Sequence, residues 1–213
     1  MFTGLIEAVC MVRSAYTTGG GMRLAVDLGK LAQESKIGDS IAINGVCLTI
    51  AQLRGGLAEL EVSSETLTKS TLGKLKSSSP VNTELAIKAT DRFGGHFVLG
   101  HVDGTATIKA IERQWLFVDI KFAASPELLA QMVVKGSVAV DGISLTIADM
   151  DEEGFSVSII PETLKKTTLG AAKTGDTVNI ETDIIVKTIR SVLDKILPGE
   201  QKLTAEKLKE LGF

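Results

Sequence analysis

The feature that most constrains the fold of this chain is an internal repeat with an offset of 97 residues. The segment IAINGVCLTI at 41–50 matches VAVDGISLTI at 138–147, and EVSSETLTKSTLG at 61–73 matches SIIPETLKKTTLG at 158–170. A third block around Asn82 returns at the same offset without a gap. A period this long exceeds that of a solenoid unit and is typical of a duplicated whole domain. The sequence therefore predicts two similar domains in tandem.

Within each repeat the local signals are those of short β-strands joined by tight turns. VCLTIAQL at 46–53 alternates loosely between apolar and polar residues, and Gly55-Gly56 then predicts a hairpin turn into a second strand. Gly19-Gly20-Gly21 is also interpreted as a turn, because a phosphate-binding loop would need a helix after it and a strand-like segment follows. About six short strands in each repeat predict a small Greek-key barrel, and hence an all-β fold.

Short helices are expected in each repeat. In the second one, Ser125 is a predicted N-cap and Pro126 the first helical residue, with the helix ending at Lys135-Gly136. The matched Glu-Thr-Leu segments that begin at Glu65 and Glu162 have two interpretations. They are either helix starts or a source of backbone amides and hydroxyls for a polar heterocycle.

After the second repeat, the apolar residues follow a helical spacing. This spacing predicts an amphipathic helix that ends at Pro198-Gly199. A second, polar helix is expected beyond it, capped by Thr204 and ending at Gly212. Periodicity alone leaves open whether the first, amphipathic helix packs back on the chain or forms an oligomer contact. Its apolar stripe consists of Ile185, Ile189, Val192 and Ile196, with Leu193 beside it.

Composition and termini exclude several classes of protein. The formal net charge of −3 argues against a nucleic-acid-binding protein with a broad basic surface. Two cysteines and two histidines are a poor supply of zinc ligands, and no metal is expected. The opening MFTGLIEAVCMVRS has neither a basic start nor a long apolar run. We therefore expect no signal peptide, no membrane span and a reducing cytoplasmic setting.

The two histidines lie near the junction of the repeats at Phe93-Gly94-Gly95-His96. On a strand, the separation of five residues would place His96 and His101 on opposite faces, so that they could not share a metal ion. His96 is interpreted mainly as a structural, hydrogen-bonded residue. For His101, a structural and a functional interpretation are equally open.

Cys47 and Ser144 occupy equivalent positions in the repeat, each next to a Leu-Thr pair. Both side chains are small and polar enough for a nucleophilic or hydrogen-bonding role. The alternatives are a buried, inert thiol and a strand hydroxyl that is bonded locally. The zincin, Walker, Rossmann and nucleophile-elbow patterns do not occur. The residues alone predict duplicated barrels with a ligand site in each.

Four features, in this order and at this period, resemble the riboflavin synthase family of the alpha type. They are the opening MFTGLIE, the junction GGHFVLGHVDG, the pair NGVCLTI and DGISLTI, and the pair SSETL and IPETLKKTTLG. The resemblance covers almost the whole chain and implies two tandem six-stranded antiparallel Greek-key barrels with a C-terminal α-helix. It implies the divisions 1–97, 98–183 and 184–213, of which the last assembles a homotrimer.

The resemblance also implies the last step of riboflavin biosynthesis. Two molecules of 6,7-dimethyl-8-ribityllumazine dismutate by transfer of a four-carbon unit, which gives riboflavin and 5-amino-6-(ribitylamino)pyrimidinedione. No metal or organic cofactor is implied. The reacting pair of pockets lies between the N-terminal barrel of one subunit and the C-terminal barrel of the next. An association with lumazine synthase is left open.

Site residues follow from the resemblance position by position. In the first pocket, the implied contacts are Gly4, Leu5, Ile6, Cys47, Leu48, Thr49, Val62, Ser64, Glu65 and Thr66. In the second, they are Gly100, His101, Val102, Lys135, Ser144, Leu145, Thr146, Ile160, Pro161, Glu162 and Thr163.

Four of the matched residues are candidates for the chemistry. Proton loss from the C7 methyl of the lumazine leaves a delocalised anion, so a modest but well-placed base suffices. His101 is the candidate for this proton transfer in the second pocket. Ser144 orients the ring or helps to add a nucleophile to it. Cys47 is a nucleophile or proton carrier, and Asp183 is an acid near the site or a polar support.

Two other functions are considered. A lumazine- or flavin-binding antenna protein would have the same barrels, but the loss of polar groups from one pocket would favour it, and here both pockets keep theirs. The flavin-binding barrel of a reductase would need a glycine-rich βαβ unit after the barrel, and none follows. One departure from the family is Thr188, where many members have an aromatic residue. A catalytic riboflavin synthase is therefore the favoured interpretation.

Overall fold

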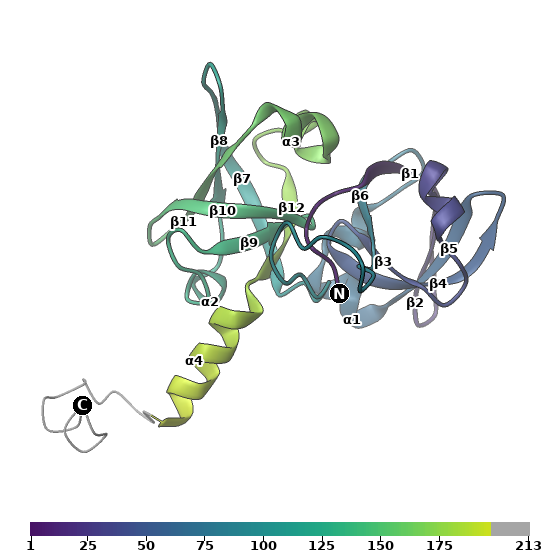
Figure 1. Ribbon diagram of the computed structural model, residues 1–213, viewed down its shortest axis with the longest axis horizontal. Coiled ribbons are helices and arrows are strands. Elements are labelled where there is room, and N and C mark those ends of the chain that lie inside the picture. Colours follow the sequence, from purple (N-terminus) through teal and green to yellow (C-terminus); the bar gives the residue numbers. More distant parts are fainter. Residues whose placement is uncertain (197–213) are drawn as a thin grey trace, which may run out of the picture.

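The computed structural model describes residues 1–196, which form two closed barrels followed by a helix (Figure 1). The predicted Pro198-Gly199 stop and the helix expected between Thr204 and Gly212 lie outside the described residues. The expected all-β fold with a C-terminal helix is confirmed.

The first barrel has the closed strand order β1-β2-β5-β4-β3-β6, with every neighbouring pair antiparallel. Both glycine-rich hairpin turns fall where the sequence placed them, at residues 19–20 and 55–56. The φ angles of Gly55 and Gly56 are +56° and +89°, which glycine adopts at no steric cost. The strands are β1 (Ala8–Thr18), β2 (Gly21–Asp27), β3 (Ser40–Ile43), β4 (Val46–Arg54), β5 (Leu57–Ser63) and β6 (Pro80–Leu85).

The second barrel repeats this order element by element, since β10-β11-β8-β7-β12-β9 is the same circle with equivalent strands. The repeat in the sequence is therefore a duplication of a complete barrel. The strands are β7 (Gly104–Arg113), β8 (Val118–Ala123), β9 (Ser137–Val140), β10 (Ile143–Met150), β11 (Gly154–Ile159) and β12 (Thr177–Thr182).

Each barrel encloses its own hydrophobic core. Ile41, Ile50 and Leu60 are fully buried in the first, and Phe122 stacks on Phe155 in the second with ring centroids 5.0 Å apart. Burial of one such side chain contributes about 1.5–3 kcal/mol. Neither core borrows strands from the other barrel.

Short helices connect the strands. Both Glu-Thr-Leu segments are helix starts, and Ser63 caps the first of them by accepting a hydrogen bond from the Thr66 amide at 3.2 Å. The helical elements are η1 (Gly29–Glu34), α1 (Ser64–Lys69), η2 (Thr71–Lys74), α2 (Pro126–Leu129), α3 (Pro161–Lys166) and η3 (Thr168–Ala171).

The expected end of α2 is wrong. Ser125 caps this helix and Pro126 is its first residue, as predicted, but the helix stops at Leu129 rather than near Gly136. Lys135 has a φ of +67°, which an α-helix does not allow. Its amide instead donates to the carbonyl oxygen of Ile147 at 2.8 Å. The conformation of Lys135 and its bond to β10 are therefore incompatible with a helix that continues to Gly136.

The barrels meet at contacts that are reciprocated between repeat-equivalent residues. Asn82 Nδ2 donates to the Asp141 carbonyl oxygen at 3.0 Å, and Asn179 Nδ2 donates to the Asn44 carbonyl oxygen at 2.8 Å. Gly45 and Gly142 lie face to face, and a Cβ on Gly45 would stand 2.6 Å from the backbone nitrogen of Gly142. The barrels are thus related by an approximate twofold axis.

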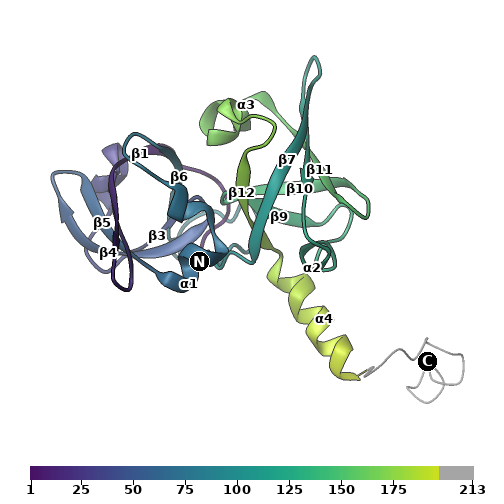
Figure 2. The ribbon, with the colours of Figure 1, turned by 180° about the vertical axis from the view of Figure 1, so that it is seen from behind.

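Helix α4 (Ile184–Ile196) follows β12 and extends away from the second barrel (Figures 1 and 2). The predicted amphipathic helix is confirmed. Its apolar stripe does not pack back on the described part of the chain, because the stripe side chains are between 48% and 56% exposed. No helix among residues 1–196 is long and apolar enough to cross a membrane.

Candidate active site

Two extended segments cross between the barrels and carry the candidate site residues. The first crossing segment, residues 2–6, precedes β1, and the second, residues 98–102, precedes β7. The amide of Phe2 donates to the Val98 carbonyl oxygen at 2.7 Å, and the amide of Val98 donates to that of Phe2 at 3.2 Å. The Ser144 amide donates to the Gly4 carbonyl oxygen at 2.8 Å, and the Cys47 amide donates to that of Gly100 at 2.9 Å. Each segment thus lies on the barrel that it does not lead into.

This arrangement corrects the expected grouping of the pockets. Residues 4–6 lie beside Ser144 of the second barrel, whereas they were assigned to the first pocket. Residues 100–102 lie beside Cys47 of the first barrel, whereas they were assigned to the second. The physical reason is the approximate twofold relation of the barrels. Under it, the segment before the first barrel contacts the second barrel, and the segment before the second barrel contacts the first.

A buried carboxylate fixes each crossing segment. Glu84 accepts hydrogen bonds from the amides of Thr3 at 2.6 Å and Gly4 at 3.0 Å. Its repeat equivalent, Glu181, accepts from the amides of Leu99 and Gly100 at 2.7 and 2.9 Å. Burial raises the pKa of both carboxyls, and the backbone hydrogen bonds act against that rise. The two segments are therefore rigidly placed.

The first site is a cavity of 250 Å³ between β4, α1 and the second crossing segment. Six predicted site residues line it together, and Val46, Lys69 and Ser70 were missed. The Glu65–Lys69 ion pair at 3.5 Å spans one helical turn, a spacing visible in the sequence that could have identified Lys69. The six are Cys47, Glu65, Thr66, Gly100, His101 and Val102.

Four residues assigned to the first pocket do not line this cavity. Leu48 and Val62 are buried in the barrel core. Thr49 and Ser64 are exposed outside the lining. Their contacts with a ligand stay predictions.

The second site contains a side-chain pair that the sequence did not reveal. His96 Nδ1 lies 2.7 Å from Ser144 Oγ, and the His96 amide donates to the Thr3 carbonyl oxygen at 3.1 Å. Burial lowers the pKa of His96, and the negative charge of Asp183 opposes that shift. A neutral imidazole beside a serine hydroxyl can accept its proton, which is how a base activates a nucleophile.

The other imidazole nitrogen of His96, Nε2, is buried and has no hydrogen-bond partner among the described residues. Buried polar atoms normally have partners, so an orphaned one at a candidate site points to a ligand group. His96 therefore has the properties of a site residue.

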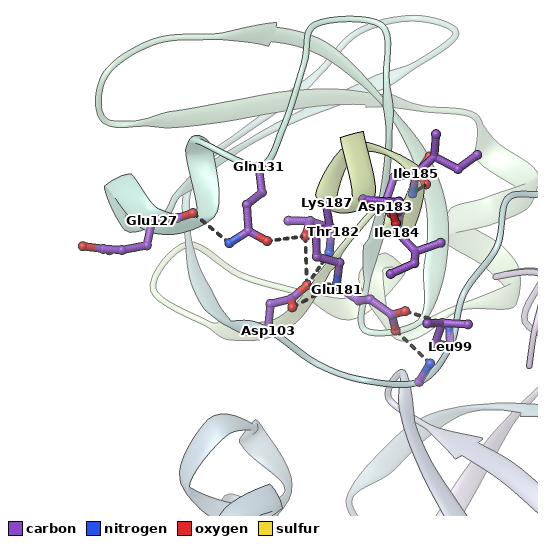
Figure 3. Close-up of polar contacts among 12 residues, drawn as sticks. Leu99, Asp103, Glu127, Gln131, Glu181, Thr182, Asp183, Ile184, Ile185 and Lys187 are labelled. Carbon is purple, nitrogen blue, oxygen red and sulfur yellow. Dashed lines mark hydrogen bonds and ion pairs between the residues drawn. The ribbon is translucent and has the colours of Figure 1, made fainter. Parts of the chain in front are cut away.

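Asp183 connects the second site to α4. Its Oδ1 accepts from the Ile185 amide at 2.9 Å, and its carbonyl oxygen accepts from the Lys187 amide at 3.1 Å (Figure 3). It thus starts the helix while its charge acts on His96.

The remaining residues assigned to the second pocket surround β10 and α3. Leu145 is half-buried and Thr146 exposed on β10, and the exposed Lys135 places its Nζ 3.5 Å from the Ala148 carbonyl oxygen. The start of α3, equivalent to that of α1, carries Ile160, Pro161, Glu162 and Thr163. Their contacts with a ligand stay predictions.

Known proteins are similar to this chain in sequence and in fold. The family model of the lumazine binding domain matches the chain twice, at residues 3–86 and 99–183. A riboflavin synthase of Actinobacillus pleuropneumoniae is 44% identical over 215 residues, and the match covers 100% of both chains. One of Bacillus subtilis (strain 168) is 40% identical over 215 residues, again with full coverage. The chain belongs to the riboflavin synthase family.

Solved structures of LumP share the fold of this family member. The complex of LumP with 6,7-dimethyl-8-(1'-D-ribityl) lumazine superposes with a TM-score of 0.78 at 18% identity. The riboflavin complex gives 0.79 at 20% identity, and each match covers 85% of this chain and 99% of LumP.

In this member of the riboflavin synthase family, His96 is a candidate for a functional role, whereas the sequence predicts mainly a structural role for it. The structure confirms that His96 is hydrogen-bonded, but residues 96–101 do not form the strand that would place the two histidines on opposite faces. The histidines separate because His96 is bonded to the second barrel while His101 lines the cavity of the first. His96 and Ser144 are 48 residues apart, and no local signal links them.

Proposed function

We propose that this protein is a riboflavin synthase that dismutates two molecules of 6,7-dimethyl-8-ribityllumazine into riboflavin and 5-amino-6-(ribitylamino)pyrimidinedione. The observation that carries the proposal is the pair of equivalent sites, one with Cys47 and His101 and the other with Ser144 and His96. A reaction between two copies of one substrate needs two similar pockets. The duplicated barrel supplies them.

Proton transfer from the C7 methyl of the donor is assigned to the histidines. Burial lowers the pKa of His96 and so favours the neutral imidazole, the form that can accept a proton. The Ser144 hydroxyl, bonded to it, is placed to orient the ring bound at this site or to help to add a nucleophile to that ring. His101 is assigned proton transfer at the first site, where Cys47 is a second proton carrier or nucleophile.

The two sites of one chain are separated by its crossing segments. One segment covers the Cys47 side, the other covers the Ser144 side, and the two are hydrogen-bonded to each other. The reacting pair is therefore assigned to the first barrel of one subunit and the second barrel of the next. The assembly is a homotrimer joined through the exposed stripe of α4. Free thiols at Cys10 and Cys47 fit the proposed reducing cytoplasmic setting.

Deletion of residues 184–213 tests the proposed assembly. The mass from light scattering should shift from trimer to monomer, because the deletion removes the exposed apolar stripe of α4. Riboflavin formation should be lost with the trimer. A truncated chain that stays trimeric would contradict the role of α4.

The function is tested by mixing the pure protein with the lumazine and following riboflavin absorbance. We expect one riboflavin for every two lumazines consumed. The matched control is the Cys47→Ala, Ser144→Ala double variant, which keeps the barrels and removes one polar group from each site. Tight binding of the lumazine without conversion by the unmodified chain would instead support the non-catalytic antenna protein.

A further inference from the structure

His101 lies in the middle of residues 99–103, and both ends of this segment are hydrogen-bonded to β12 of the second barrel (Figure 3). At the first end, Glu181 accepts from the amides of Leu99 and Gly100. At the other end, the Asp103 carboxylate accepts from the Thr182 amide at 2.8 Å. The position of His101 in the first-barrel cavity therefore depends on groups of the second barrel as well as on the first-barrel contacts of Gly100 and Val102.

Helix α4 supplies one more contact to the Asp103 end of this segment. Lys187, in its first turn, donates to both carboxylate oxygens of Asp103, at 2.8 and 3.0 Å. The Lys187 and Asp103 side chains are only 21% and 22% exposed. In every other ion pair among residues 1–196, both side chains are at least 37% exposed. Reduced contact with water strengthens the attraction and weakens its screening by salt.

The first barrel lacks this contact. The repeat equivalent of Asp103 is Glu7, which accepts from the Leu85 amide at 2.7 Å just as Asp103 accepts from Thr182. Glu7 forms no ion pair among the described residues, whereas Asp103 pairs with a lysine from beyond the repeat. The duplication thus explains the carboxylate at this position but not the cation that holds it.

We propose that Lys187 is a positioning residue for His101: through Asp103 it ties the first turn of α4 to the segment that places His101 beside Cys47. The inference rests on the proposed function, in which His101 transfers a proton. Lys187 does not line the cavity and acts only through the backbone. Because α4 also carries the stripe assigned to the trimer, assembly and the placement of His101 are linked.

The connection is short enough to transmit a displacement. Only Val102 lies between Asp103 and His101, and it packs against the core of the first barrel. Without Lys187, the Asp103 carboxylate is held only by the amide and hydroxyl of Thr182, at 2.8 and 2.9 Å. Successive Cα atoms are about 3.8 Å apart, so we expect a shift of Asp103 to reach the backbone of His101. A misplacement of about 1 Å in a reacting group can lower turnover by as much as 10²-fold.

The test compares two lysine variants of the full chain. Lys187→Met should lower kcat roughly tenfold with little change in KM, because the ligand contacts remain while the proton carrier is misplaced. Lys187→Arg, which keeps the charge, should restore most of the activity. The control is Lys88→Met, which removes the exposed ion pair with Glu34 and should leave kcat unchanged.

A double variant shows whether Lys187 acts through His101. In the His101→Gln background, Lys187→Met should lower kcat less than twofold, because the group that it positions is already gone. Independent, multiplying losses would overturn the proposal, and so would equal kcat values for Lys187→Met and Lys88→Met. Should Lys187→Met misfold, Asp103→Asn makes the same comparison, since it removes the charge and keeps an acceptor for Thr182.

A measurement without turnover separates this proposal from the function itself. The ring signals of His101, followed by NMR in the labelled protein, should shift in Lys187→Met and stay in place in Lys88→Met. If the unmodified chain forms no riboflavin, the proposed function fails while this comparison still reports on positioning. Unchanged His101 signals in an active Lys187→Met protein would overturn the positioning role alone.

Discussion

The two sites are built on equivalent strands but differ in how their histidines are held. At the first site, the exposed His101 stands beside Cys47 in an open cavity. At the second, the buried His96 is hydrogen-bonded to Ser144. The repeat equivalent of His101 is Leu5, so the second site does not obtain a histidine from the duplicated segment. Duplication thus supplies two sites on equivalent strands, and the linker between the barrels makes them chemically different.

The largest effect on turnover is expected at the buried pair. His96→Gln should lower kcat roughly 10²-fold or more, because it removes a neutral base that is bonded to Ser144. Ser144→Ala should have a similar effect, and the double variant should be little worse than either, because the pair acts as a unit. Steady-state rates of the three variants are the measurement, and losses that simply multiply would show two independent groups.

A smaller effect is expected at the exposed site. His101→Gln should lower kcat roughly tenfold and change ligand affinity far less, because an exposed imidazole can be replaced in part by water. Affinity is measured by fluorescence titration with riboflavin, beside the rate. If both histidine variants lose activity equally and also lose folded structure, the proposed difference between the sites disappears.

The smallest effect on turnover is expected at the joint between the barrels. Asn44 Oδ1 accepts from the Asn82 amide at 2.8 Å, and its equivalent Asp141 accepts from the Asn179 amide at the same distance. Burial raises the pKa of Asp141 from 3.8 to about 7, against the hydrogen bond from Asn179. Ionisation of the buried Asp141 therefore lowers the stability of the folded protein, whereas the equivalent Asn44 has no charge to bury.

The sign of this effect gives a stability prediction. The folded state binds the Asp141 proton more tightly than the unfolded state, so stability is lost as pH rises from about 4 to about 7. Asp141→Asn should remove that pH dependence and stabilise the protein at pH 8 by on the order of 4 kcal/mol, with turnover unchanged. Urea denaturation at pH 5 and pH 8 checks it, and an undiminished pH dependence in the variant would assign the titration elsewhere.

Much of the fold follows from the sequence because its signals are local. The Gly55-Gly56 turn and the stripe around Ile189 each depend on neighbouring residues, and the 97-residue repeat is found by comparing the sequence with itself. The structure confirms all three. The expected helix as far as Gly136 could not be excluded from the sequence, because the bond of Lys135 to Ile147 on β10 joins residues that are not neighbours in the chain.

The site residues were easier to predict than their grouping. Cys47 and Ser144 stand out because the repeat aligns them, yet sequence does not reveal which barrel a preceding segment contacts. Residues 4–6 and 100–102 exchange barrels through contacts far apart in the sequence. The partner of His96 could not be predicted for the same reason, since its bond to Ser144 joins residues 48 apart in the sequence.

The most direct test of the two-barrel site is complementation between two impaired variants. His101→Gln impairs the first site and His96→Gln the second, so each homotrimer is slow. After the two are unfolded together and refolded at equal amounts, about a quarter of the head-to-tail interfaces should join two intact sites. Riboflavin formation in the mixture should then rise to about a quarter of the unmodified rate, well above the mean of the separate variants. A mixture no faster than that mean would contradict a reacting pair formed between the first barrel of one subunit and the second barrel of the next.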